Sequence, residues 1–291
     1  MKSNYQKPFL IAEIGCNHMG NLDLAKELII EAKKCNADYA KFQKRDNKYL
    51  LKEDYDLPHP VPHNSFGKSY GEHREFLEFS IQNHIELNNF CKKNDIKYAV
   101  SVWEINSAKE IIENIEIDFI KVPSACNLDR ELLEFLFDNF NNNIHISLGM
   151  TTKSEIKRIV DFSTLKGRSK DLVLYACESS YPSKFENLNL PAIKELNFEY
   201  SSIINSVGFS GHHLGISIDV IAFTLGAKYI ERHFTLDRTF KGTDHAASLE
   251  PQGLSKLSRD LNNAYLALQS KNKASNDEEN MRAKLKKTTT L

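Results

Sequence analysis

Residues 206–234 read SVGFSGHHLGISIDVIAFTLGAKYIERHF, and this stretch decides the fold. A short apolar run (206–209) precedes a segment with helical spacing (215–227), and a second apolar run (229–232) follows it. A strand, a helix and a strand in this order predict two parallel strands joined by a helical crossover. Each strand is followed at once by a histidine, His212 after the first and His233 after the second.

The same unit recurs along the whole chain. Candidate strands are 9–14, 39–42, 98–102, 119–122, 144–148, 172–177, 206–209 and 229–232. Helical spacing marks 22–35, one long helix over 73–94, then 105–115, 129–140, 152–165, 189–198, 215–227 and a last helix over 253–269. Eight such units predict an α/β fold, a single-domain (β/α)8 TIM barrel, whose functional residues gather at the C-terminal ends of the strands.

Length and composition fit one soluble enzyme domain. The chain has 291 residues, a formal net charge of −1 and five cysteines with no CxxC pair. The low charge argues against nucleic-acid or membrane partners, and the cysteines argue against disulfides or a thiolate zinc site. No apolar run suggests a signal peptide or a transmembrane helix, so we expect a cytoplasmic protein. We predict a catalytic barrel over 1–270 and a polar tail or linker over 271–291.

The two histidines are candidate metal ligands. Because adjacent strand ends lie close together in a barrel, His212 and His233 could bind one divalent ion and leave positions open for substrate. Such an ion would act as a Lewis acid toward a carbonyl group. The alternative is that each histidine only satisfies a local hydrogen bond. We expect His213 to point elsewhere.

A second candidate group is cationic. Lys41 and Lys121 lie inside apolar runs at two strand ends, where burial requires an anionic partner. Hydroxyl groups near other strand ends could complete a pocket for a phosphate and a carboxylate, and they belong to Ser124, Ser147, Ser179 and Ser210. The alternative is that the lysines form buried salt bridges with Glu13, Glu178 or Glu231.

A third group could bind the hydroxyls of a sugar, and it comprises Glu13, Gln43, Tyr181 and Asp244. The long connection 44–72 is interpreted as a lid over the barrel mouth, with a decorative insertion as the alternative. No P-loop, GxGxxG or GxSxG motif is present, so nucleotide binding and a serine elbow find no support.

Several motifs together resemble the sialic acid synthase family, in family order over about 9–252. They are IAEIGCNHMGNLDLAKELI (11–29), DYAKFQ (38–43), SFGKSYGEHREFLEFS (65–80), IKVPSACN (120–127), SLGMTT (147–152), CESSYPSKFENLNL (177–190), GFSGHHLG (208–215) and TLGAKYIERHFTLDRTFKGTDHAASLEP (224–251). The resemblance implies condensation of phosphoenolpyruvate with N-acetylmannosamine, its 6-phosphate or a related 2-acetamido sugar, giving a nonulosonic acid and phosphate by C–O cleavage. The last motifs look most like the branch that includes the vertebrate enzyme.

The resemblance also implies roles for single residues. His212 and His233 match metal ligands, with Mn²⁺ the expected ion and Mg²⁺ or Co²⁺ as alternatives. Residues that match the phosphoenolpyruvate site are Lys41, Lys121, Ser124, Ser147 and Ser210, with Ser179 where some relatives carry Asn. Glu13, Gln43, Tyr181 and Asp244 match residues that bind the sugar or lie beside the reacting centre, so the expected catalytic set is Glu13, Lys41, Lys121, His212 and His233.

Two departures from the family pattern matter. Cys126 stands where many relatives carry Asp or Glu, so we take Glu13 as the substitute general base. Relatives usually carry a C-terminal antifreeze-like domain that reaches across a homodimer, and this sequence ends where that domain would begin. A homodimer is expected from the resemblance alone. The competing hypotheses are another phosphoenolpyruvate-dependent sugar-acid synthase and a non-catalytic sugar- or phosphate-binding homologue.

Overall fold

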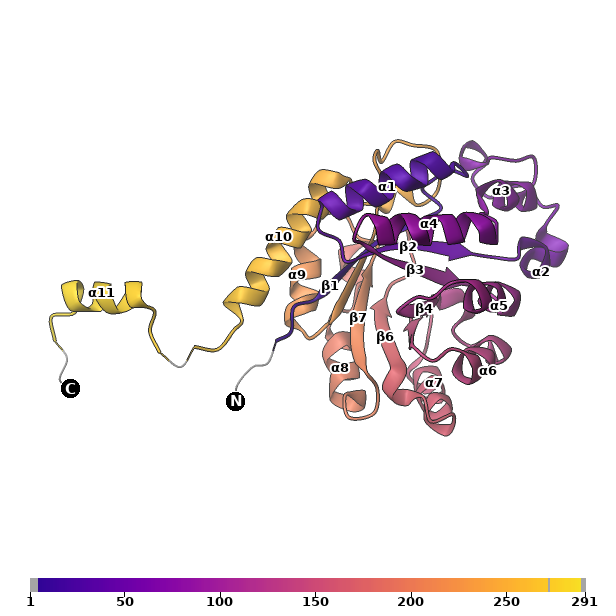
Figure 1. Cartoon of the computed structure of the whole chain (residues 1–291). Coiled ribbons are helices and arrows are strands. Elements are labelled where there is room, and N and C mark those ends of the chain that lie inside the picture. Colours follow the sequence, from indigo (N-terminus) through magenta and orange to yellow (C-terminus); the bar gives the residue numbers. More distant parts are fainter. Residues whose placement is uncertain (1–4, 272, 289–291) are drawn as a thin grey trace.

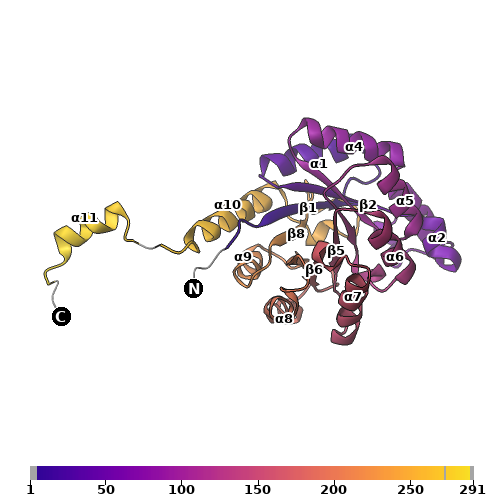
Figure 2. The same cartoon turned by 60° about the horizontal axis from the view of Figure 1, so that its bottom comes forward.

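A closed eight-stranded parallel barrel forms the centre of the molecule, in the order β1 to β8 with β8 returning to β1. The computed structural model describes residues 5–271 and 273–288. The strands are β1 Phe9–Gly15, β2 Tyr39–Lys44, β3 Lys97–Val102, β4 Phe119–Val122, β5 Asn143–Ser147, β6 Leu172–Cys177, β7 Ser206–Gly211 and β8 Tyr229–His233. Helices surround the barrel (Figures 1 and 2), so the predicted single-domain (β/α)8 fold is confirmed.

The helices follow the predicted order with three differences. Their bounds are α1 Leu22–Lys34, α2 Asn47–Leu51, α3 Tyr70–Leu77, α4 Ile81–Lys93, α5 Ile105–Asn114, α6 Arg130–Asn139, α7 Lys153–Leu165, α8 Pro191–Tyr200, α9 Ser217–Thr224, α10 Pro251–Ala267 and α11 Asn276–Leu285. In the described part of the chain, none of these helices is both long and apolar enough to cross a membrane.

The single helix predicted over 73–94 is wrong, because α3 and α4 are separated by Glu78, Phe79 and Ser80. Ser80 caps α4 through a reciprocal capping box with Asn83, which starts a new helix at that point. Glu78 is extended, and its carboxylate accepts from the Arg45 backbone N–H (3.0 Å) and from Lys44 (3.3 Å). A local cap and a tertiary contact together override the continuous apolar spacing.

The connection 44–72 contains α2 and two short 3-10 turns rather than loop alone. Figure 1 shows α2 and α3 beyond the C-terminal end of β2, the end at which the cavity described below opens. The segment expected as a polar tail carries α11, which has no buried residue and lies apart from the barrel in both views. Residues 272 and 289–291 of that segment, like 1–4 of the expected barrel domain, lie outside the described residues.

The barrel interior changes from apolar to charged along its axis. Side chains of a parallel barrel alternate between the lumen and the helices. The lower lumen holds a cluster of its own, made of Ile11, Tyr39, Ala99, Phe119, Val173, Tyr175 and Tyr229. Two residues further along the strands, the same alternation places Glu13, Lys41 and Lys121 in the lumen, and in β8 it places Glu231. An aromatic floor therefore lies beneath a charged layer, and the charged layer faces the mouth.

Candidate active site

A cavity of about 190 Å³ opens at the C-terminal ends of the strands. Eleven of the twelve predicted site residues line it: Glu13, Lys41, Gln43, Lys121, Ser124, Ser147, Ser179, Tyr181, Ser210, His212 and His233. Asp244 is not part of the lining, but its Oδ2 lies 3.8 Å from Nδ1 of His233. Residues from all eight strand ends or the loops that follow them thus meet in one place, as barrel topology requires.

Buried lysines and carboxylates, the charged layer described above, form the bottom of the cavity. Lys41 Nζ pairs with Glu13, lies 3.6 Å from Glu231 Oε2 and donates to Ser101 Oγ at 2.8 Å. Lys121 Nζ donates to Glu231 Oε1 at 2.5 Å and lies 4.4 Å from the centroid of the Tyr175 ring. The salt bridges considered above as an alternative are therefore present for Glu13 and Glu231. Glu178 takes no part, because its carboxylate accepts from Ser180 instead.

The ion pairs favour the charged forms of Glu231 and Lys41. Burial raises the pKa of Glu231, but the Lys121 and Lys41 ammonium groups outweigh it and lower that pKa to about 2. Burial lowers the pKa of Lys41, but Glu13 and Glu231 outweigh it, so the net shift is upward. Ser210 Oγ also donates to Glu231 Oε1, at 3.1 Å. Because Lys121 carries three N–H donors and gives one to Glu231, it can also bind an anion in the cavity.

Acid should lower the free energy of unfolding in a defined pH window, because it protonates Glu231 in the charged layer. The pKa of Glu231 is about 2 in the fold against an ordinary 4.5, so the unfolded chain binds the proton more readily. The stabilisation is complete above pH 4.5 and is lost as the pH falls toward 2, and it amounts to about 3 kcal/mol. Urea unfolding at several pH values should show a shallower acid slope for Glu231→Gln than for the wild type. The exposed Glu131→Gln should keep the wild-type slope, and equal slopes for Glu231→Gln and the wild type would contradict the assignment.

His212 and His233 lie next to each other in the cavity lining, with ring centroids 5.4 Å apart. His212 Nδ1 faces the backbone carbonyl of Glu178 at 2.6 Å. Because a carbonyl only accepts, Nδ1 carries the proton and Nε2 keeps its lone pair for a ligand. Burial and the neighbouring His233 lower the pKa of His212 to about 3, so the ring is neutral near pH 7. The Tyr181 ring covers His212, with centroids 4.0 Å apart.

These donors suit an open metal site. Among the described residues, His233 Nδ1 is buried without a hydrogen-bond partner, and an imidazole nitrogen with a free lone pair is a ligand for a borderline divalent ion. Across residues 5–271 and 273–288, no group of three or more His, Cys, Asp or Glu side chains could hold an ion. A closed structural zinc site is therefore not formed by the described residues, whereas a site completed by substrate and water oxygens fits.

A buried network fixes the strand ends that carry the histidines. Arg232 Nη1 donates to Asp219 Oδ2 (2.5 Å) and to the Gly215 carbonyl (2.8 Å), and Nη2 donates to the His213 carbonyl (2.6 Å). The His213 ring lies 3.1 Å from Arg232 Nη1 and does not line the cavity. His213 directly follows His212, and Arg232 directly precedes His233. This network therefore sets the spacing of the two candidate ligands.

Hydroxyls form another part of the cavity wall. The Gly149 N–H donates to Ser124 Oγ at 3.0 Å, and a Cβ at Gly149 would collide with Ser179 Oγ and lie 2.7 Å from Ser124 Oγ. Glycine thus allows two hydroxyls and a backbone N–H to meet at one point. This cradle of Ser124, Ser179 and Gly149 is suited to the oxygens of an anion.

Gly149→Ala should weaken anion binding with little loss of stability. The added methyl group displaces two hydroxyls, so we expect the KM for a phosphate-bearing substrate to rise about tenfold, the value of roughly one lost hydrogen bond to a charged group. Steady-state kinetics with the anionic substrate varied would measure it. Gly253→Ala on α10 is the matched control, because its Cβ meets only ordinary contacts from 3.4 Å. An unchanged KM in Gly149→Ala would contradict the cradle.

Three residues at the site were not predicted as functional. Glu231 joins both lysines, Ser101 binds Lys41, and Trp103 lines the cavity wall. Each shares the inward alternation of its strand, and that signal could have found them. Cys126 does not line the cavity, and burial raises the pKa of its thiol to about 12. It therefore stays protonated near neutral pH and cannot act as a base.

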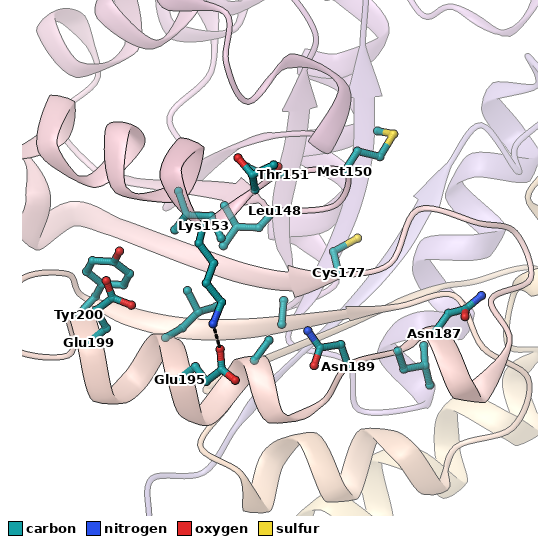
Figure 3. Close-up of a pocket in the computed structure, with 16 residues that line it drawn as sticks. Leu148, Met150, Thr151, Lys153, Cys177, Asn187, Asn189, Glu195, Glu199 and Tyr200 are labelled. Atoms are coloured by element: carbon teal, nitrogen blue, oxygen red, sulfur yellow. Dashed lines mark hydrogen bonds and ion pairs between the residues drawn. The ribbon is translucent and has the colours of Figure 1, made fainter.

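A second cavity of about 450 Å³ lies beside the first, between α7 and α8 (Figure 3). The two cavities share Met150 and Cys177 in their walls. The ion pair of Lys153 and Glu195, 2.8 Å apart, crosses between the two helices (Figure 3). Among the described residues, its lining contains no histidine and no buried lysine, so the predicted site residues gather in the smaller cavity instead.

Fold and site together define a (β/α)8-barrel enzyme whose cavity, at the C-terminal ends of the strands, brings two buried lysines together with a pair of imidazoles. The NeuB family model matches residues 28–273. Human N-acetylneuraminate-9-phosphate synthase is 38% identical over 266 residues, 91% of this chain and 72% of the human protein. The Drosophila melanogaster protein of the same name is 37% identical over 264 residues, 89% of this chain and 68% of its own length. The chain belongs to the NeuB family.

A solved structure agrees with this placement. The N-acetylneuraminic acid (sialic acid) synthetase from Leptospira borgpetersenii serovar Hardjo-bovis, in complex with citrate, superposes with a TM-score of 0.80 at 28% identity. The match covers 98% of this chain and 94% of that one. The predicted family resemblance is therefore confirmed by sequence and by fold.

Proposed function

We propose that this protein condenses phosphoenolpyruvate with the aldehyde of a 2-acetamido sugar, such as N-acetylmannosamine, and releases a nonulosonic acid and phosphate. One observation carries the proposal: the cluster of Lys41, Lys121, Glu13 and Glu231 lies in the same cavity as the His212–His233 pair. The human and fly relatives, both N-acetylneuraminate-9-phosphate synthases, support it.

Phosphoenolpyruvate would occupy the lysine and serine side of the cavity. Lys41 and Lys121 both pair with the carboxylate of Glu231, and Ser210 donates a hydrogen bond to the same carboxylate. The hydroxyls of Ser124, Ser147 and Ser179 line the same cavity. Two ammonium groups and several hydroxyls are suited to a substrate with a phosphate and a carboxylate, and their fixed positions provide preorganised electrostatic stabilisation.

The acceptor sugar would lie between the histidines and Gln43. His212 and His233 would hold a divalent ion, with Mn²⁺ the expected choice and Mg²⁺ or Co²⁺ as alternatives, and a bound ion of this kind polarises a carbonyl oxygen. Gln43 donates to Glu13 Oε1 at 2.7 Å and Tyr181 stacks on His212, so both can contact sugar hydroxyls. Burial raises the pKa of Asp244, but His233 and Arg74 outweigh it, which keeps Asp244 an acceptor.

The reaction would proceed in three steps, and side chains of the cavity would act in each. C3 of phosphoenolpyruvate would form a bond to the aldehyde carbon as the carbonyl π electrons move to the aldehyde oxygen, which takes up a proton from solvent and becomes a hydroxyl. The carboxylates of Glu13 and Glu231 would stabilise the positive charge that develops at C2. Water would then add at C2, with Glu13 as the proposed acceptor of its proton. The C2–O bond to phosphate would break as the new C2 hydroxyl becomes the ketone and gives its proton to the departing phosphate, which Lys41 and Lys121 would stabilise. Holding two substrates in one small cavity supplies the positioning contribution.

An isotope experiment tests the reaction. The enzyme is incubated with phosphoenolpyruvate, a panel of 2-acetamido and 2,4-diacetamido sugars, Mn²⁺ and ¹⁸O-labelled water, and the products are weighed by mass spectrometry. We expect one sugar to give a nonulosonic acid and unlabelled phosphate, because C–O cleavage leaves the bridging oxygen on phosphorus. Labelled phosphate would contradict the mechanism, and no product with any sugar would favour a non-catalytic binding protein.

A further inference from the structure

Tyr175 on β6 joins the aromatic floor of the barrel to the charged layer above it. The side chain is fully buried in the lower lumen and does not line the cavity. The centroid of its ring lies 4.4 Å from Nζ of Lys121, which does line the cavity. An ammonium group at this distance is attracted by the electrons of the ring face, and the attraction is stronger where water is excluded. Tyr175 is therefore in direct contact with one of the two site lysines.

The two site lysines differ in how their charge is balanced. Lys41 Nζ pairs with Glu13 and lies 3.6 Å from Glu231 Oε2. In the described part of the chain, Lys121 pairs with one carboxylate only, that of Glu231 at 2.5 Å. Burial lowers the pKa of Lys121, Glu231 raises it and the charge of Lys41 lowers it again, so the net shift is downward. The charged form of Lys121 thus gains most from a further contact, and the Tyr175 ring provides one.

An aromatic ring suits this place better than a second carboxylate would. The ring attracts an ammonium group without carrying a net negative charge, so it does not compete with an anionic ligand for the same cation. Burial raises the pKa of the Tyr175 hydroxyl well above its usual range, which keeps the side chain uncharged. Lys121 has three N–H donors. One binds Glu231 and one can face the ring, which leaves the third for an anion in the cavity.

Two neighbours fix the position of the Tyr175 ring. Gly208 on β7 is paired with Tyr175, and a Cβ at Gly208 would lie 2.7 to 2.9 Å from three atoms of the ring. The glycine therefore leaves the space that the ring occupies. The Tyr175 hydroxyl and Nδ1 of His145 form a hydrogen bond of 2.9 Å. His145 is itself held by stacking on Phe119, with ring centroids 3.8 Å apart.

His145 is a polar residue in an otherwise apolar place. As far as the structure describes the chain, its Nε2 is buried without a hydrogen-bond partner. Burial lowers the pKa of His145 well below its usual value, so the ring is neutral near pH 7. Because a buried nitrogen without a partner lowers stability, an apolar side chain would be favoured here if packing alone mattered. The hydrogen bond to Tyr175 gives a reason for the histidine, since it fixes the ring that contacts Lys121.

We propose that Tyr175 is a positioning residue, whose ring holds the Lys121 ammonium group in place for the anionic groups of phosphoenolpyruvate. His145 and Gly208 act through Tyr175, because they fix its ring. This inference rests on the proposed function, and it adds that the affinity for phosphoenolpyruvate depends on a side chain that does not touch the substrate.

Fluorinated phenylalanines at position 175 test the proposal with little change in the shape of the core. Tyr175→Phe keeps the ring and should bind phosphoenolpyruvate nearly as the wild type does. Fluorine atoms on that ring withdraw the electrons that attract a cation, so a trifluorinated phenylalanine should weaken binding about 5- to 30-fold, as for a lost buried cation–π contact. Calorimetry on the full chain with Mn²⁺ gives the Kd, and melting curves check that each variant is folded. The KM for the acceptor sugar should stay unchanged, because the ring acts through Lys121 alone.

Two ordinary substitutions complete the test. Gly208→Ala displaces the Tyr175 ring without removing it, so it should raise the KM for phosphoenolpyruvate about as much as the trifluorinated side chain does. Tyr39→Leu is the matched control, because Tyr39 belongs to the same aromatic floor but its ring contacts Lys97, at 5.4 Å, which does not line the cavity. This control should lose stability through its smaller side chain and keep the wild-type KM for phosphoenolpyruvate.

Two results would overturn the proposal. A Kd for phosphoenolpyruvate that does not change with fluorination would mean that the Tyr175 ring only fills space. Equal rises in the KM values of both substrates in Gly208→Ala would mean a general distortion of the barrel rather than an effect on Lys121.

The binding measurement, made without any sugar, separates this inference from the proposed function. If no sugar is turned over, but phosphoenolpyruvate binds and fluorination weakens that binding, the proposed function fails and the inference stands. If product forms and fluorination changes neither the Kd nor the KM for phosphoenolpyruvate, the inference fails and the proposed function stands. A wild type that does not bind phosphoenolpyruvate would overturn both.

Discussion

His233→Ala is expected to lower metal-dependent turnover by at least about a hundredfold, since changes that only touch a ligand's supporting residues already lower metal affinity about 10- to 100-fold. His233 is one of two imidazoles whose ring centroids lie 5.4 Å apart, and its Nδ1 has no hydrogen-bond partner. Its removal leaves His212 as the single imidazole at the cavity. Mn²⁺ binding followed by calorimetry, together with turnover measured over a range of Mn²⁺ concentrations, gives the readout.

The control for this variant is His63→Ala, because His63 is exposed and belongs to a short 3-10 turn. It should bind Mn²⁺ and turn over like the wild type. Full activity of His233→Ala at low Mn²⁺ would rule out a role as ligand. Loss of activity with unchanged Mn²⁺ affinity would reassign His233 to substrate contact.

Lys121→Met is expected to lower kcat/KM for phosphoenolpyruvate by about 10²- to 10³-fold, the range seen when one preorganised donor is removed from a catalytic site. Methionine keeps most of the side-chain length but removes the charge that faces Glu231 and the cavity. Initial rates at varied phosphoenolpyruvate measure the effect. The exposed Lys157→Met on α7 is the control, and it should stay within about twofold, as surface substitutions usually do.

The single variant also leaves Glu231 with fewer counter-charges, and breaking a buried pair destabilises a protein by about 3–5 kcal/mol. The double variant Lys121→Met, Glu231→Gln removes both charges and keeps the core neutral. If the double variant regains stability but its kcat/KM for phosphoenolpyruvate stays well below that of Glu231→Gln alone, the further loss reflects anion binding by Lys121. Recovery of near wild-type activity in the double variant would mean that Lys121 only neutralises Glu231.

Much of the fold could be predicted because the sequence repeats one physical unit. Each strand is a short apolar run followed by helical spacing, and polar residues appear where the run ends, as at Lys41 and His233. Inside the barrel, the alternation of two carries the prediction further. Tyr39 and Lys41, or Tyr229 and Glu231, face the same lumen, so the sequence of these strands places an aromatic side chain two residues before a charged one.

The features that could not be predicted depend on contacts between residues that are far apart in the sequence. Helical spacing runs unbroken through 73–94, yet Glu78 leaves the helix because it binds Lys44 and the Arg45 backbone. The stacking of Arg45 on Trp103 joins the ends of two strands, and no local pattern in either strand indicates it. Glu231 was considered only as a salt-bridge partner, because the sequence does not show that one carboxylate can reach both lysines.

The central claim is that His212 and His233 share a divalent ion in the same cavity in which Lys41 and Lys121 hold phosphoenolpyruvate. An anomalous-scattering map from a crystal of this protein grown with Mn²⁺ and phosphoenolpyruvate tests it in one measurement. We expect a single manganese peak between the two imidazoles, with the phosphate of phosphoenolpyruvate in contact with the two ammonium groups. A manganese peak away from both histidines, or phosphoenolpyruvate bound outside this cavity, would contradict the account.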